Sequence, residues 1–365
     1  MVCLKRTIFF GLIGATVFGA SAGAQPTAQP SLDGPDWPHW AYGFLSPLAP
    51  GDRLAPPCPE TARPTECRYP PPVVQDDGTR HGLPDTDLSF TRNEAHYDYG
   101  PADWYPGDHP RMPDIVAHGR ESAGIRACAL CHYPNGQGKT ENAHVAGLPA
   151  AYILQQLDAF ANGDRLSSDP RKVNTNEMAA IARDLTDTEK REVAEYYASI
   201  DLQQFIRVIE SEEAPQVRPN SAGLMIPVPA ASAIELGQRI IEVPEHPERT
   251  ELQRDPRGGF VAYVPEGSLS KGEALVTTGA GKTIQCTVCH GQGLRGLGDI
   301  PGIAGRTASY TMRQLWDFKQ GTRVSQIMVP VVQSLSVEDM LNISAYLASQ
   351  TPYPAAHSTT SSTIE

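Results

Sequence analysis

The stretch at residues 127–136, ACALCHYPNG, places two thiols and one imidazole within five positions, at Cys128, Cys131 and His132. The same CxxCH arrangement returns at residues 286–290 as CTVCH. Four chemistries use paired thiols at this spacing: structural zinc binding, thiol–disulfide exchange, iron–sulfur ligation and covalent haem attachment. The histidine that directly follows the second thiol distinguishes among them, and any interpretation must account for both copies.

Covalent haem attachment accounts for both motifs. Thiols three positions apart on one helical turn can reach the two vinyl groups at one edge of a porphyrin, and the next side chain then lies beneath the ring, where its imidazole can ligate iron. A zinc site would require further thiols or histidines, and a thioredoxin motif would require a βαβ context. The sequence therefore predicts two covalently bound haem c groups. Their attachment and proximal residues are Cys128, Cys131, His132, Cys286, Cys289 and His290.

The two motifs belong to an internal repeat. When the motifs are aligned, several further positions are identical in the two copies, and beyond the last of them the first copy has a longer loop. The identical pairs are Gly138 with Gly296, Tyr152 with Tyr310, Leu157 with Leu315, Phe160 with Phe318, and Arg165 with Arg323. The two haem-bearing segments are therefore duplicates.

After the loop, Met178 aligns with Met328. Each methionine precedes a helix-start signature and an apolar helix face, so it can reach the open side of the haem. Most methionines only fill cores, and Met312 and Met340, which do not recur, are interpreted as packing or surface residues. Recurrence predicts that Met178 and Met328 are the axial ligands opposite His132 and His290. When an imidazole and a thioether fill the coordination sphere of the iron, the reduction potential is raised and the site suits electron transfer. His144, which aligns with Gly302, is a much weaker ligand candidate.

The combined pattern of CxxCH, AG…Y…QL…F..G.R and Met…L[ST]…Y.AS resembles the two-haem cytochrome c-four family of tandem class I cytochrome c domains. The resemblance implies an all-α fold with two small domains packed as pseudo-twofold copies. In such domains the proximal histidine commonly donates to a proline carbonyl, a role that Pro301 fits. Ala143 stands at the corresponding position in the first copy, so this feature is expected to be altered there and the two potentials to differ.

The rest of the chain divides around these copies. We expect a signal peptide at residues 1–24, with Lys5 and Arg6 before a short apolar run, and a disordered tail at the end. Cys58 and Cys67 lie in a Pro-rich stretch of an exported chain, which favours a small disulfide loop over free thiols. The expected regions are a loop-rich N-terminal extension (25–113), a first repeat (114–200), a connector with a short hairpin around GGFVAYVPEG (201–269), a second repeat (270–354) and the tail (355–365).

Composition limits the partners. The net charge of −12 makes nucleic acid an improbable partner, and no segment after the signal is long and apolar enough to span a membrane. The sequence predicts a periplasmic carrier, not an enzyme, that passes single electrons between redox proteins such as a dehydrogenase and an oxidase or reductase. Two alternatives stay open: a dihaem enzyme of the peroxidase or thiosulfate dehydrogenase type, and a cytochrome subunit of a larger dehydrogenase.

Overall fold

The computed structural model describes residues 37–70 and 76–352, which all belong to one unit of the chain that begins at Leu32. The predicted signal peptide (1–24) and the predicted tail (355–365) lie outside the described residues. Within the described ranges, no helix is both long and apolar enough to cross a membrane.

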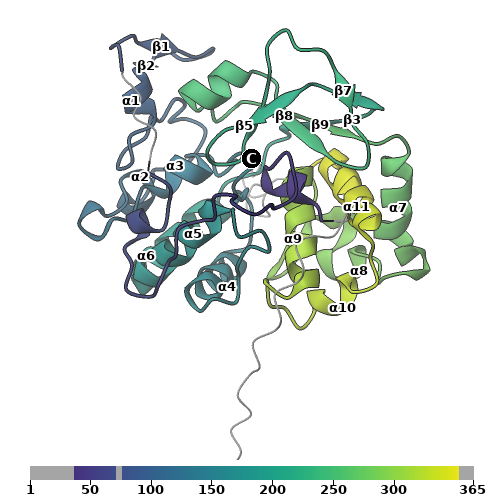
Figure 1. The fold of residues 1–365 in the computed structure, drawn as a ribbon. Helices are drawn as coiled ribbons and strands as arrows, with labels where there is room; N and C mark the ends of the chain where they lie inside the picture. Colours follow the sequence, from purple (N-terminus) through teal and green to yellow (C-terminus); the bar gives the residue numbers. More distant parts are fainter. Residues whose placement is uncertain (1–36, 71–75, 353–365) are drawn as a thin grey trace, which may run out of the picture. The chain divides into compact units, whose positions relative to one another are not determined.

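The first repeat is helical (Figure 1). Its helices are α2 (Asp114–Ala117), η3 (Glu121–Ala123), α3 (Cys128–His132), α4 (Ala150–Ala161), α5 (Val173–Asp184) and α6 (Asp187–Ala198). Helix α6 begins where the sequence predicts it, because Thr186 and Glu189 cap each other's backbone N–H groups. Helix α4 packs against α5 and α6 and buries Ile153 and Leu157. This packing forms the apolar core of the repeat.

The second repeat has the same order of α-helices, with one additional short helix, η6. They are α7 (Ser268–Thr278), η5 (Gly279–Gly281), α8 (Thr287–His290), η6 (Gln292–Leu294), α9 (Ala308–Gln320), α10 (Met328–Val332) and α11 (Val337–Ser349), with a short hairpin of β10 (Gly296–Leu297) and β11 (Ile300–Pro301). Ser336 and Asp339 cap α11 as predicted. Helix α11 packs against α7 and α9. A Cβ atom at Gly272 would lie 2.1 Å from the Asn342 carbonyl oxygen, so the contact between α7 and α11 requires glycine.

The connector is built from strands, so the all-α prediction is confirmed only for the repeats. Strand β9 (Phe260–Val264) lies between β3 (Ile206–Glu210), which is parallel to it, and β8 (Ile241–Pro244), which is antiparallel. The expected hairpin around GGFVAYVPEG is wrong, because these residues form the central strand β9. Its parallel partner comes from a distant segment, which local patterns do not reveal. The remaining connector elements are β4 (Glu213–Ala214), β5 (Val217–Pro219), β6 (Met225–Pro227), β7 (Ile234–Glu235) and η4 (Arg249–Gln253).

The N-terminal extension is loop-rich, as expected, and contacts both repeats. Its elements are η1 (His39–Tyr42), η2 (Pro64–Glu66), β1 (His81–Gly82), β2 (Ser89–Phe90) and α1 (Arg92–Ala95). The predicted disulfide between Cys58 and Cys67 is confirmed, with the two Cα atoms 5.0 Å apart. Against the second repeat, the Tyr42 hydroxyl donates to Asp317 over 2.6 Å. The extension therefore joins the repeats as well as covering the first.

Candidate functional site

The first CxxCH motif lines a cavity of about 1100 Å³ together with Met178. Helix α3 supplies Cys128, Cys131 and His132, while Met178 comes from the middle of α5. Apolar side chains of α4 and α6 complete the wall, among them Ile153, Leu157 and Val193. The structure thus brings together all four side chains that the sequence assigns to the first haem. The volume lies slightly above the range of about 300–1,000 Å³ that is typical of ligand pockets. Two thiols, an imidazole and a thioether around a partly apolar cavity of this size are the donor set that a haem c requires.

Burial keeps one thiol of each CxxCH motif in its neutral form. Burial, and secondarily the neighbouring Cys131, raises the pKa of Cys128 to about 12. Burial likewise raises the pKa of Cys286 to about 11. Both thiols are half-buried, and Cys128 lines the cavity described above.

Both proximal histidines are held in one tautomer. The Nδ1 atom of His132 lies 2.9 Å from the Ala143 carbonyl oxygen, and Nδ1 of His290 lies 2.8 Å from that of Pro301. Because a carbonyl only accepts, each Nδ1 carries the proton and each Nε2 keeps its lone pair for iron. The expectation that Ala143 alters this hydrogen bond is wrong. The acceptor is a backbone carbonyl, which alanine supplies as well as proline does.

The second motif lies in more open surroundings. Helix α8 carries half-buried Cys289 and His290, while Val288, which lies between the two cysteines of the motif, is 55% exposed. Met328 is half-buried at the start of α10, where its backbone N–H donates to the Ser325 hydroxyl over 3.1 Å. Burial lowers the pKa of His290 and keeps the imidazole neutral, as metal ligation requires.

Residues from outside the first repeat also line its cavity, and the sequence analysis did not find them. They belong to the N-terminal extension and to the connector. They are Arg68, Tyr69, Pro70, Arg92, Asn93, His96, Tyr97, Asp98, Tyr99, Arg218, Asn220, Ser221, Ala222, Glu251 and Arg254. No local pattern marks them, because only the tertiary fold brings these segments to the motif. The second repeat also contributes Tyr310, Arg313, Gln314 and Asp317.

A hydrogen-bonded cluster joins the two repeats. Arg165 donates to Tyr310 over 2.9 Å, and the aligned Arg323 donates to Tyr152 over 2.8 Å. The backbones of the two arginines pair as an isolated β-bridge. Burial would raise the pKa of Tyr152, but Arg323 and Arg165 outweigh burial and lower it. Both arginines and both tyrosines appear among the repeat identities, and that signal could have indicated a shared interface.

His144, the weak alternative ligand, lies between the repeats. Its Nε2 is 2.7 Å from the Thr307 hydroxyl, and its Nδ1 is hydrogen-bonded to the Gln137 carbonyl. Burial lowers its pKa to about 3, and nearby Arg306 contributes to the same shift. It is absent from the cavity lining among the described residues. Both ring nitrogens are engaged in hydrogen bonds, so the structure gives His144 a packing role.

Comparisons with known proteins agree with this geometry. The family model described as cytochrome c matches residues 116–201. Cytochrome c-554(548) of Halomonas halodenitrificans is 36% identical over 76 residues, which are 20% of this chain and 92% of that protein. Two longer matches are 25% identical over 240 residues and 64% of this chain. They are the thiosulfate dehydrogenase electron acceptor of Stutzerimonas stutzeri, covered to 83%, and cytochrome c4 of Pseudomonas aeruginosa, covered to 87%. This chain covers between 28% and 92% of the length of the individual relatives.

Proposed function

The chain belongs to the cytochrome c family, and we propose from this premise that it is a periplasmic dihaem carrier of single electrons. One observation carries the proposal. The cavity of the first repeat gathers two thiols, a proximal imidazole with a free Nε2 lone pair, and a methionine on a neighbouring helix. A haem bound there supplies a one-electron iron couple. The aligned residues of the second repeat support a second haem of the same kind.

The chain's own side chains set the conditions at each iron. Cys128 and Cys131 fix the porphyrin edge at the first site, and Cys286 and Cys289 at the second. The hydrogen bonds of His132 and His290 orient the two imidazoles. Met178 and Met328 would each supply a thioether to one iron, which would favour the reduced state. With an imidazole and a thioether bound, each iron would be suited to electron transfer rather than to substrate activation.

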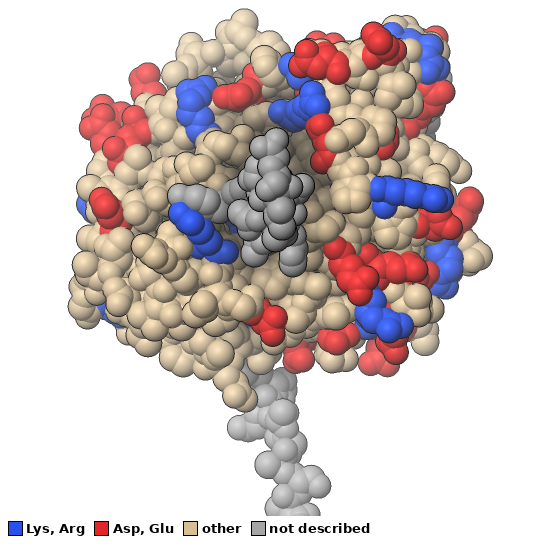
Figure 2. All heavy atoms as spheres, turned by 180° about the vertical axis from the view of Figure 1, so that it is seen from behind, with Lys and Arg blue, Asp and Glu red and all other residues tan. Residues whose placement is uncertain are grey.

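The proposed location and partners follow from the surface and the thiols. A disulfide in the extension supports an oxidising compartment such as the periplasm. Acidic and basic side chains are interspersed on the face shown in Figure 2. Redox proteins are the proposed donors and acceptors. A relative that is named an electron acceptor of thiosulfate dehydrogenase supports this class of partner.

Absorbance spectroscopy of the purified holoprotein tests the proposal. The pyridine haemochromogen assay and the intact mass should show two haems. Absorbance spectra that show both haems low-spin, with a methionine-to-iron charge-transfer band, would support the carrier. The band should persist in peroxide and in modest cyanide. One high-spin haem that reacts with peroxide would instead favour the dihaem enzyme, and protein without attached haem would overturn the proposal. Co-purification in a stable complex from the native periplasm would favour the subunit of a larger dehydrogenase.

A further inference from the structure

Helix α5, which carries Met178, packs against α4, but the apolar residues that it buries fully are mostly small. Its buried apolar residues are Val173, Ala179, Ala180 and Ala182, and alanine removes much less surface from water than leucine or methionine does. Helix α10, which carries Met328, likewise has few large buried residues, with Val332 the one that is fully buried. The position of α5 therefore depends on contacts that other segments make with it.

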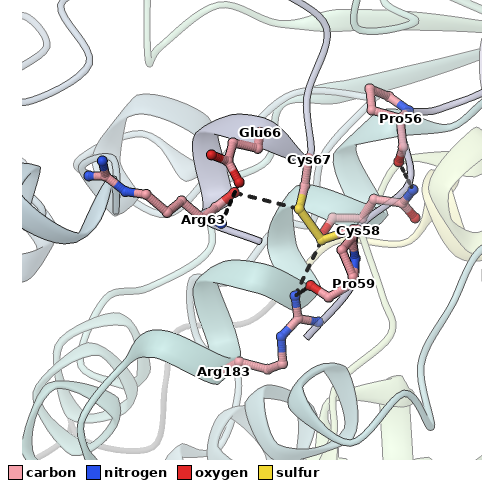
Figure 3. The surroundings of a disulfide bond; sticks show 8 residues. Pro56, Cys58, Pro59, Arg63, Glu66, Cys67 and Arg183 are labelled. Atoms are coloured by element: carbon pink, nitrogen blue, oxygen red, sulfur yellow. Dashed lines mark hydrogen bonds between the residues drawn. A yellow bond between two sulfur atoms is a disulfide. The ribbon is translucent and has the colours of Figure 1, made fainter. Parts of the chain in front are cut away.

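The segment at residues 53–69, here called the disulfide loop, supplies several of these contacts. Asn176 precedes Met178 by two positions, and its side-chain amide donates to the Pro56 carbonyl over 3.0 Å. On the other side, Nη2 of Arg183 donates to the Pro59 carbonyl over 3.2 Å and lies 3.3 Å from the Cys58 sulfur. Figure 3 shows Arg183 reaching the disulfide and Pro59. Helix η2, inside the loop, also packs against α5.

A chain of ion pairs connects the end of the same loop to α5. Arg68 pairs with Asp98 at 2.7 Å, and Asp98 lies 3.5 Å from Arg126. Nε of Arg126 then donates over 2.7 Å to Glu177, whose side chain is mostly buried. Glu177 directly precedes Met178. Residues on both sides of the disulfide are thus linked to the turn of α5 that carries the methionine.

The methionine of the second repeat is held differently. The N–H of Met328 donates to Ser325, and the hydroxyl of Thr283 donates to the Val331 carbonyl over 2.7 Å. These contacts come from the second repeat itself. Both disulfide cysteines of the described chain lie in the N-terminal extension, against α5. The two candidate ligand helices therefore differ in their external support.

We propose that the disulfide loop is a positioning element that keeps Met178 at the first iron. The proposal rests on the function proposed above, in which Met178 is an axial ligand. A cross-link restricts the conformations open to the loop, so the loop stays in place against α5. Without the cross-link, the loop and α5 separate more often, and the state in which Met178 has left the iron becomes more populated.

The test is the full-length holoprotein with Cys58→Ser and Cys67→Ser together. Cyanide should bind one of the two haems about tenfold faster or more than in the wild type, because the open state at that haem is more populated. The charge-transfer band should fall toward half on mild heating, as one of two methionines dissociates. Amide hydrogen exchange of residues 173–184 should accelerate, whereas exchange of residues 328–349 should not.

Two further variants control the experiment. Asn176→Ala keeps the disulfide and removes one hydrogen bond of the loop, so it should accelerate cyanide binding at the same haem by a smaller factor. Ser325→Ala is the matched change at the second site, and it should act on the other haem alone. If the double cysteine variant does not fold, Asn176→Ala combined with Arg183→Ala addresses the same contacts with the cross-link intact.

The outcomes separate the two proposals. A wild-type protein without the charge-transfer band would overturn the methionine assignment, and with it the proposed function of the site. A wild-type protein with the band, and a folded disulfide variant whose cyanide rates and hydrogen exchange are unchanged, would overturn the positioning role alone. Faster exchange of α5 with altered ligand binding at one haem supports the positioning role.

Discussion

The two CxxCH motifs are close copies in sequence but lie in different surroundings. Segments of the N-terminal extension and the connector enclose the first motif, and the disulfide loop supports the helix that carries its methionine. At the second motif, Val288 and Ile327 are 55% and 67% exposed. The repeat thus carries the proposed ligand set, whereas segments outside the repeat determine how enclosed the first site is. Two sites with the same ligands can differ in solvent access and hence in reduction potential.

Removing one methionine at a time should give the largest effect. Met178→Ala and Met328→Ala should each abolish about half of the charge-transfer band and lower the potential of one haem, by on the order of 0.1–0.3 V within the range that axial ligands set. Redox titration followed by absorbance measures both. An exogenous ligand such as imidazole should bind faster to the second site of Met328→Ala than to the first site of Met178→Ala, because the second site is more open. Equal entry rates at the two sites would contradict the difference in enclosure.

The interface arginines should give the next largest effect. Arg165→Ala and Arg323→Ala should each lower the free energy of unfolding by about 2–4 kcal/mol. Each change leaves one half-buried tyrosine hydroxyl without its arginine donor and removes one of the two arginine donors to Gln156 and to Gln314. Tyr152→Phe, which removes a single hydroxyl, should reduce it by about 1 kcal/mol. Urea unfolding measures all three. The two arginines occupy equivalent positions, so a large inequality between them would show that the repeats contribute unequally to the interface.

The two capping boxes should give a smaller and equal effect. Thr186→Ala and Ser336→Ala each remove an N-cap oxygen that accepts from the third residue of the following helix, and should lower the free energy of unfolding by about 1 kcal/mol. Unfolding monitored by circular dichroism measures this. Because Asp339 also accepts from Lys282, a larger loss at Ser336 would indicate that this ion pair depends on the cap.

The sequence predicted the features that depend on local spacing or on recurrence. The capped helices at Thr186 and Ser336 and the Cys58–Cys67 disulfide are of this kind, and the structure contains each. The features that it did not predict depend on pairing between distant segments. Strand β9 needs a parallel partner from β3, and the wall of the first cavity needs residues such as Tyr69 and Arg254 from separate regions. Their positions follow from tertiary packing, which no short pattern carries.

The smallest predicted effect concerns pH. His109 lies in the extension, with Nε2 at 3.2 Å from Asp103 and Nδ1 at 3.0 Å from the hydroxyl of Tyr196 in α6. Burial lowers the pKa of His109, but the hydrogen bonds to Asp103 and to the Pro110 carbonyl outweigh burial and raise it above the ordinary value of 6.5. In the second repeat, the aligned Tyr346 is half-buried at the corresponding place. A pH-dependent contact of this kind is therefore a property of the first repeat.

The sign of the effect follows from proton linkage. A histidine whose pKa is higher in the folded state contributes stability that is fully present below its unfolded value, and this stability is lost as pH rises through the folded pKa. His109→Gln should therefore lower the free energy of unfolding more at about pH 6 than at about pH 8, by a few tenths of a kcal/mol to about 1 kcal/mol. Asp103→Asn should remove the same pH dependence while it retains the imidazole. Urea unfolding at the two pH values measures both changes. A wild-type protein whose excess stability over His109→Gln is equal at both pH values would show that the imidazole stays neutral, and that the contact with Tyr196 contributes packing alone.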